Sequence, residues 1–258
     1  MTTASRYVSR LVRAVGFAVR EQAVGLVSGL FTTAPAGPGV VVVPGFACTD
    51  RALTVTSTWL TSRGYRATGA GIGFNLGCTT DLVTRLVRRV EHHVERTGGP
   101  VVLVGHSRGG WLSRMVAVRR PDLVRALVMV GSPVLDPLGA NPRVLAAARL
   151  LTRLNVLGIG GLLDGDCFTG PCFRDNVEAL NAPLSVPALA VYSREDRVAP
   201  WELCRDPHAR CVEVTGGHAD LLLNPDFYTV LEPWLSDRTA AQARLANAPD
   251  AALAVAHA

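Results

Sequence analysis

One serine in this sequence stands where a nucleophile could be held at the end of a strand. Ser107 lies in VGHSRGGW (104–111), between the apolar run VVLV (101–104) and an amphipathic stretch. Where a strand turns sharply into a helix, the residue at the turn has strained backbone geometry, and the residues two positions away must be small. Gly105 and Gly109 meet that demand. The pattern predicts a nucleophilic Ser107; a plain glycine turn is the alternative.

A serine hydroxyl is a weak nucleophile and needs a base within hydrogen-bond reach. We expect His218 to be that base, because it follows the last predicted strand in VTGGHADLL (214–222) and its flanking glycines place it in a loop. His106 is adjacent to Ser107, and we expect its side chain to point elsewhere. The other histidines are predicted in helices, in a polar loop or in the tail: His92, His93, His208 and His257.

The base must in turn be oriented by a carboxylate. SREDRVAPW (193–201) directly follows a predicted strand and offers Glu195 and Asp196. We favour Asp196, a short carboxylate on a tight turn, and keep Asp136 as the rival position. The chain order Ser107, Asp196, His218 is typical of serine nucleophiles on a parallel sheet.

Acyl transfer also needs donors for the oxyanion. The backbone N–H after the nucleophile, at Arg108, is the first candidate. The second is the N–H of Phe46 in PGFACTD (44–50), after an early strand. Losing such a donor typically costs about 3 kcal/mol of transition-state stabilisation. Phe46 could also serve simply as a buried aromatic residue, and the two roles are compatible.

The elements that must position these residues alternate along the chain. Uniformly apolar, β-branched runs are typical of strands buried on both faces of a parallel sheet. The sequence predicts an α/β fold with a doubly wound, mostly parallel sheet. Strands are expected at 40–44, 65–71, 100–105, 123–132, 187–193 and 209–216, and helices at 53–62, 81–96 and 111–120.

The same pattern divides the chain into four parts. The sheet core is expected to span residues 37–132 and 187–236. Residues 133–186 contain no predicted strand and a helical run at 143–155, which predicts a cap or lid insertion. Residues 1–36 are expected to form an amphipathic N-terminal helix, and residues 237–258 an alanine-rich tail.

Several segments together resemble one known family. The chain is similar to lipase/esterase-like members of the α/β-hydrolase superfamily from actinobacteria over about residues 40–235. The resemblance implies Ser107 as nucleophile, His218 as base, Asp196 as acid, and Phe46 and Arg108 as oxyanion donors. Many relatives begin the oxyanion loop with His-Gly, where this chain has Pro44-Gly45. The segments are VVVPGFACTD, GIGFNLG, VVLVGHSRGGWLSRMVA, VMVGSP, YSREDRVAPW and VEVTGGHADLLLNP.

Composition excludes some classes of function. The formal net charge is +5 and all 26 basic residues are arginine, but they are scattered without interleaved aromatic residues, so we expect no nucleic-acid partner. Charges interrupt the apolar stretch 11–31, which argues against a spanning helix and a signal peptide. We therefore expect a cytoplasmic protein; weak contact of the N-terminal helix with a membrane surface is the alternative.

The six cysteines have no CxxC spacing, and no histidine lies at a metal-ligand interval from a cysteine pair. We therefore expect no metal and no cofactor. Two readings of the thiols stay open. One is six reduced thiols. The other is disulfides that join Cys48 to Cys78 and Cys172 to Cys204, in loops expected at one edge of the sheet.

Large apolar residues near the predicted site indicate its substrate. Phe46, Phe74, Trp111 and Trp201 lie close in sequence to predicted site residues, and the insertion adds apolar residues of its own, Leu150, Leu151, Leu154 and Leu157. Such a pocket suits a small-molecule hydrophobic ester or thioester. The alternatives are an acyltransferase or biosynthetic tailoring enzyme with the same three residues, and a non-catalytic binding protein on this fold.

Overall fold

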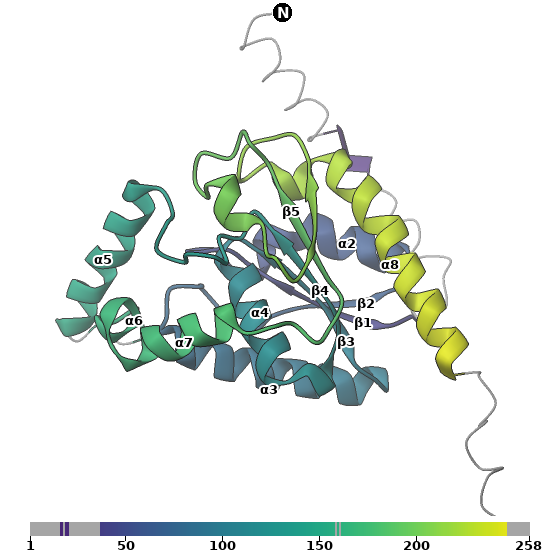
Figure 1. Ribbon diagram of the computed structural model, residues 1–258, viewed down its shortest axis with the longest axis horizontal. Coiled ribbons are helices and arrows are strands. Elements are labelled where there is room, and N and C mark those ends of the chain that lie inside the picture. Colours follow the sequence, from purple (N-terminus) through teal and green to yellow (C-terminus); the bar gives the residue numbers. More distant parts are fainter. Residues whose placement is uncertain (1–15, 18, 21–36, 158, 160, 247–258) are drawn as a thin grey trace, which may run out of the picture.

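The computed structural model describes residues 16–17, 19–20, 37–157, 159 and 161–246 (Figure 1). Its centre is one six-stranded sheet with the order β2-β1-β3-β4-β5-β6, in which every neighbouring pair is parallel. The predicted doubly wound α/β fold is therefore confirmed. The strands are β1 (Gly39–Val43), β2 (Arg66–Gly69), β3 (Val101–His106), β4 (Val124–Val130), β5 (Ala188–Tyr192) and β6 (Arg210–Glu213).

Burial of the strands follows their place in the sheet. β1, with the sequence GVVVV, is buried along its whole length, as is β5. The edge strands β2 and β6 are only partly buried. Alternate valines of β1 point to opposite faces, so a run of four valines fills the cores on both sides of the sheet.

Helices cover both faces of the sheet (Figure 1). On one face, α3 (Thr79–Thr97) and α4 (Arg108–Arg119) share a core with the strands. On the other face, α2 (Thr54–Ser62) and α8 (Pro225–Ala246) pack around the buried Trp59 and Phe227. Short 3-10 turns join these elements: η1 (Asp50–Leu53), η2 (Pro121–Leu123), η3 (Trp201–Cys204) and η4 (Leu221–Leu223).

Residues 131–187 connect β4 to β5, and we call them the β4–β5 segment. This segment contains three helices. They are α5 (Pro142–Val156), α6 (Asp166–Thr169) and α7 (Pro171–Asn181), and they gather at one end of the molecule (Figure 1). α5 begins where the Asn141 side chain accepts a hydrogen bond from the Arg143 N–H at 3.0 Å. α7 packs against α3 and α4 and so joins this segment to the sheet core.

The structure describes the two ends of the chain only in part. α8 continues through Ala246 and so crosses the boundary expected at residue 236. Most of the predicted N-terminal helix lies outside the described residues. Its Phe17 packs against Tyr228, with ring centroids 4.6 Å apart. Within the described ranges, no helix combines the length and apolarity needed to span a bilayer.

A buried ion pair joins α4 to the loop between η3 and β6, and its arginine also bonds to the β4–β5 segment. Arg114 Nε lies 2.5 Å from Asp206 Oδ2, and both side chains are 1% exposed. The same guanidinium donates to the carbonyls of Ala179 and Ala182 at the end of α7, each at 3.0 Å. Because each polar group has a partner, removing one charge would leave the other buried and unpaired.

We predict that Asp206→Asn lowers the free energy of unfolding by about 3–5 kcal/mol, because the Arg114 charge remains buried without its counter-ion. Asp122→Asn is the matched control, since Asp122 pairs with Arg120 at the surface, and it should leave stability nearly unchanged. Chemical denaturation of the two variants measures both. Equal stabilities would contradict the role given to the buried pair.

Candidate active site

Ser107 occupies a tight turn between β3 and α4. Its backbone angles, φ 52° and ψ −124°, are rare for a residue with a side chain. A Cβ on Gly105 would lie 2.4 Å from the Gly109 carbonyl oxygen, and a Cβ on Gly109 would lie 2.2 Å from that of Val43. Both positions therefore require glycine. The helix begins at Arg108, earlier than the predicted residue 111, so Ser107 directly precedes it.

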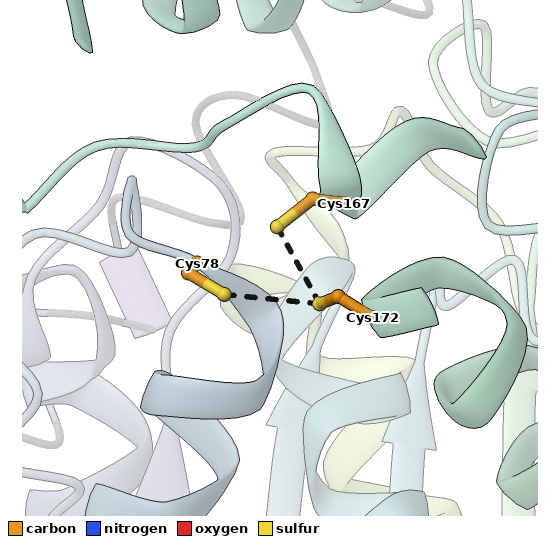
Figure 2. A group of neighbouring side chains, drawn as sticks. All are labelled: Cys78, Cys167 and Cys172. Atoms are coloured by element: carbon orange, nitrogen blue, oxygen red, sulfur yellow. Dashed lines mark hydrogen bonds between the residues drawn. The ribbon is translucent and has the colours of Figure 1, made fainter. Parts of the chain in front are cut away.

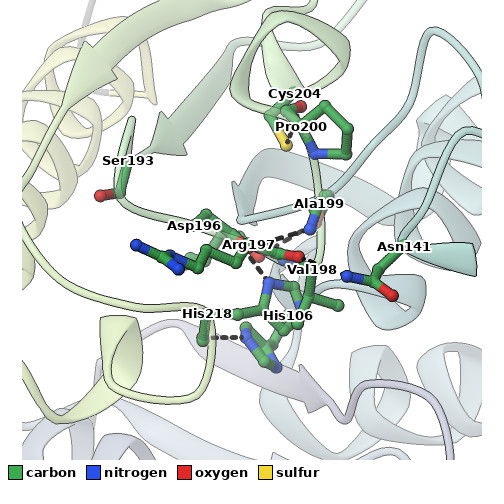
Figure 3. Close-up of polar contacts among 12 residues, drawn as sticks. His106, Asn141, Ser193, Asp196, Arg197, Val198, Ala199, Pro200, Cys204 and His218 are labelled. Atoms are coloured by element: carbon green, nitrogen blue, oxygen red, sulfur yellow. Dashed lines mark hydrogen bonds and ion pairs between the residues drawn. The ribbon is translucent and has the colours of Figure 1, made fainter. Parts of the chain in front are cut away.

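His218 and Asp196 form a close pair (Figure 3). His218 Nδ1 lies 2.6 Å from Asp196 Oδ2, and the Asp196 side chain is almost fully buried. The other carboxylate oxygen, Oδ1, accepts the N–H groups of Val198 and Ala199 at 2.8 and 2.9 Å. These bonds hold the carboxylate so that it orients the ring. The rival Asp136 instead accepts the Leu138 N–H and makes no bond to His218 among the described residues.

Gly131, at the end of β4, leaves room for this pair. Its φ is +55°, and a Cβ there would lie 3.3 Å from both Asp196 Oδ2 and His218 Nδ1. Ser107 is next to it, because the Ser107 N–H donates to the Val130 carbonyl at 2.8 Å. Within the described residues the Ser107 hydroxyl makes no hydrogen bond of its own. Three residues distant in sequence thus come to one edge of the sheet.

His106 was not expected to be the base, and its side chain is bonded to the backbone of His218. Its Nε2 lies 3.0 Å from the His218 carbonyl oxygen, and the two rings are 4.8 Å apart (Figure 3). Burial lowers the pKa of His106 to about 4, so the ring is neutral at pH 7 and donates this hydrogen bond. His106 therefore supports the loop that carries His218.

Asn75 holds the loop that follows β1. Its side-chain amide donates to the Pro44 carbonyl at 2.8 Å, and its backbone exchanges bonds with Ala47 and Cys48. The N–H groups of Phe46 and Arg108 donate to no other described residue, as an oxyanion site requires. Asn75 was not among the residues predicted from the sequence. Its only signal was its place in the motif GIGFNLG (71–77).

The Arg108 side chain is buried and turned toward the start of α3. It donates to the carbonyls of Asn75 and Gly77 and to the Thr79 hydroxyl, at 3.2, 2.9 and 3.1 Å. Burial lowers its pKa to about 10, which leaves the group charged at neutral pH. In the part of the chain that the structure describes, Arg108 has no carboxylate partner.

An open pocket lies beside Ser107, with about 780 Å³ of space when the part open to solvent is included; we call it the cavity. Phe46 and Trp111 line it as predicted, and so does Arg108. Phe74 and Trp201 do not, which corrects the prediction. Phe74 is 65% exposed, and Trp201 stacks on Tyr192 with centroids 5.8 Å apart.

The β4–β5 segment supplies much of the cavity wall, though through other residues than expected. Leu150, Leu151, Leu154 and Leu157 are absent from the lining, and Leu150 and Leu157 are exposed on α5. The apolar lining from this segment comprises Pro133, Pro137, Leu138, Ala140, Val144, Leu145, Ala148, Leu163, Cys167, Phe168, Phe173, Val177 and Leu180. An apolar chain could lie against this wall.

Three of the cysteines lie in one cluster that matches neither predicted disulfide. Cys172 Sγ lies 3.7 Å from Cys78 Sγ and 3.6 Å from Cys167 Sγ (Figure 2). All six cysteines are free thiols, so the predicted Cys48–Cys78 and Cys172–Cys204 bonds are wrong. Cys204 Sγ instead donates to the Pro200 carbonyl. A hydrogen bond from Cys167 lowers the pKa of the Cys78 thiol to about 6.

Comparison with known proteins identifies the family of the chain. The sequence model of the alpha/beta hydrolase family matches residues 28–258. The chain belongs to the alpha/beta hydrolase family. Among curated proteins, this alpha/beta hydrolase is 31% identical over 138 residues to triacylglycerol lipases of Pseudarthrobacter phenanthrenivorans and Burkholderia plantarii. Each match covers 46% of this chain. It covers 43% of the first lipase and 38% of the second, so the chain spans less than half the length of these relatives.

Solved structures share the hydrolase fold at low identity. A Bacillus licheniformis lipase in its mature form is similar with a TM-score of 0.59 and 18% identity, over 80% of this chain and 94% of that one. A Paleococcus ferrophilus monoacylglycerol lipase is similar with a TM-score of 0.56 and 18% identity, over 81% and 97%. At this identity the likeness shows the fold alone.

We predict that Asp196→Asn lowers the rate at which Ser107 reacts with a fluorophosphonate probe by three to four orders of magnitude, about the loss known for such an acid. The amide would favour the wrong tautomer of His218. Asp136→Asn is the control and should react at the wild-type rate. Labelling kinetics followed by mass spectrometry measure both. The reverse result would assign the acid to Asp136.

Proposed function

We propose that this alpha/beta hydrolase cleaves a hydrophobic carboxylic ester or thioester through an acyl-enzyme on Ser107. One observation carries the proposal. The oriented His218–Asp196 pair lies at the same sheet edge as Ser107, whose strained turn opens into the apolar cavity. A nucleophile, its base and a binding space for an acyl chain are thus adjacent.

In the proposed first half-reaction, the Ser107 Oγ attacks the substrate carbonyl carbon while its proton passes to His218 Nε2. The Asp196 carboxylate accepts a hydrogen bond from the His218 Nδ1–H and so stabilises the imidazolium that forms. The N–H groups of Phe46 and Arg108 donate to the oxyanion of the tetrahedral intermediate. When the intermediate collapses, the proton moves from His218 to the departing alcohol or thiol, and the acyl group stays on Ser107.

In the second half-reaction, water attacks the acyl-enzyme and gives its proton to His218. The tetrahedral intermediate uses the same two donors. Collapse returns the proton to Ser107 and releases a carboxylic acid. An acceptor alcohol, amine or thiol in place of water would make the reaction an acyl transfer, and the product distinguishes the two.

The substrate class is inferred from the cavity wall. The lining is dominated by aliphatic and aromatic side chains such as Trp111, Leu145 and Phe173. A wall of this kind favours an acyl chain over a charged or sugar-like group. The triacylglycerol lipase names of the two curated relatives point to the same chemistry.

We predict that p-nitrophenyl esters are hydrolysed by the wild-type protein and that kcat/KM rises with acyl length until the cavity is filled. Each buried methylene should add about 0.8 kcal/mol of binding. Ser107→Ala should abolish turnover, and quenching the wild-type reaction should trap the acyl group on the peptide that contains Ser107. Hydrolysis that survives in Ser107→Ala, or an acyl group on another residue, would overturn the proposal.

A further inference from the structure

Three cysteine side chains from separate elements meet at the side of the cavity (Figure 2). Cys78 immediately precedes α3, Cys167 is the second residue of α6, and Cys172 is the second residue of α7. Their sulfur atoms all lie within 4.8 Å of one another. Cys167 and Cys172 are buried and Cys78 is partly buried, so the group forms a compact, largely enclosed set of sulfur donors.

The spacing of the sulfurs fits a shared metal ion. Zn²⁺ binds thiolate sulfur at about 2.3 Å in tetrahedral geometry, which separates two ligand sulfurs by about 3.8 Å. The Cys172 sulfur lies 3.7 Å from that of Cys78 and 3.6 Å from that of Cys167. A disulfide would bring only two sulfurs to about 2.05 Å and leave the third outside the bond. All three sulfurs are accounted for by one ion.

Polar groups around Cys172 are placed as supports for a metal ligand. The Asn176 side-chain amide lies 3.3 Å from Cys172 Sγ, and the Thr80 hydroxyl lies 3.2 Å from it. Both can donate hydrogen bonds to a thiolate, as the outer partners of metal ligands do. The Cys172 N–H is held by Asp166 Oδ2 at 3.0 Å, which fixes the start of α7.

Charge provides a second, independent observation. Arg108 is buried, and within the described part of the chain its hydrogen bonds go only to uncharged acceptors. A buried cation without a counter-ion is costly. Arg108 donates to Gly77 and Thr79, the residues on either side of Cys78, so its guanidinium lies beside the cysteine group. Three thiolates with one Zn²⁺ carry a net charge of −1, which balances Arg108.

We propose that Cys78, Cys167 and Cys172 form a Zn²⁺ site, with water at the fourth position. Binding releases the three thiol protons and forms three Zn–S bonds, with no change of oxidation state. The ion ties the start of α3 to α6 and α7, and thus fastens the β4–β5 segment where Cys167 lines the cavity. This role does not depend on the reaction proposed for Ser107.

Titration of the reduced full-length protein with Zn²⁺, in competition with a chromophoric chelator, tests the site. The expected stoichiometry is one Zn²⁺ per chain. Cys78→Ser and Cys172→Ser should each weaken binding by more than about 100-fold, the upper end of what losing an outer partner costs. Cys48→Ser is the matched control, because Cys48 lies outside the group, and it should bind as the wild type does.

Two further readouts keep the test independent of activity and of variant folding. In the wild-type protein, Zn²⁺ should slow alkylation of Cys78, Cys167 and Cys172 and leave that of Cys48 unchanged. Zn²⁺ should also raise the Tm of the wild type and of Cys48→Ser, but not of Cys78→Ser. Failure of the reduced wild type to bind Zn²⁺, or equal affinity in Cys78→Ser, would overturn the proposal.

Discussion

The close approach of three backbone segments around Ser107 is the constraint on which the site depends. The end of β1, the end of β3 and the start of α4 meet where only glycine fits, at Gly105 and Gly109. A side chain at either position would push α4 away from the sheet. Because the turn is packed from both sides, Ser107 is held in a backbone conformation that it would rarely adopt alone. Packing of the sheet core stabilises this strained residue.

The ends of neighbouring strands then bring the remaining groups to Ser107. Gly131 at the end of β4 leaves space for the His218–Asp196 pair. Asp196 is fixed by two backbone N–H groups, and the His218 loop is held by the neutral ring of His106. Each group is oriented by a partner on a different element. The geometry of the site therefore depends on the order of the strands and not on any one loop.

The β4–β5 segment is joined to the sheet core through polar anchors as well as apolar contacts. Arg114 of α4, paired with Asp206, donates to the end of α7, and the three thiols lie where α6 and α7 meet the start of α3. Arg108 lies between the turn at Ser107 and these thiols. The wall of the cavity and the residue that follows Ser107 are thus parts of one packed unit.

The alternation of strands and helices, the tight turn at Ser107 and the strand-end positions of His218 and Asp196 could be predicted from local patterns. Apolar runs, glycine spacing and strand-end positions each depend on residues close in sequence. The orientation of His106, the cavity lining and the meeting of Cys78 with Cys167 and Cys172 could not. Those features depend on which side chains of distant elements face one another. Helix α5 turns Leu150 outward and Ala148 inward, a choice made by its packing. Only the tertiary structure decides such contacts. The periodicity of a sequence shows which face of a helix or strand is apolar, but not which element packs against that face.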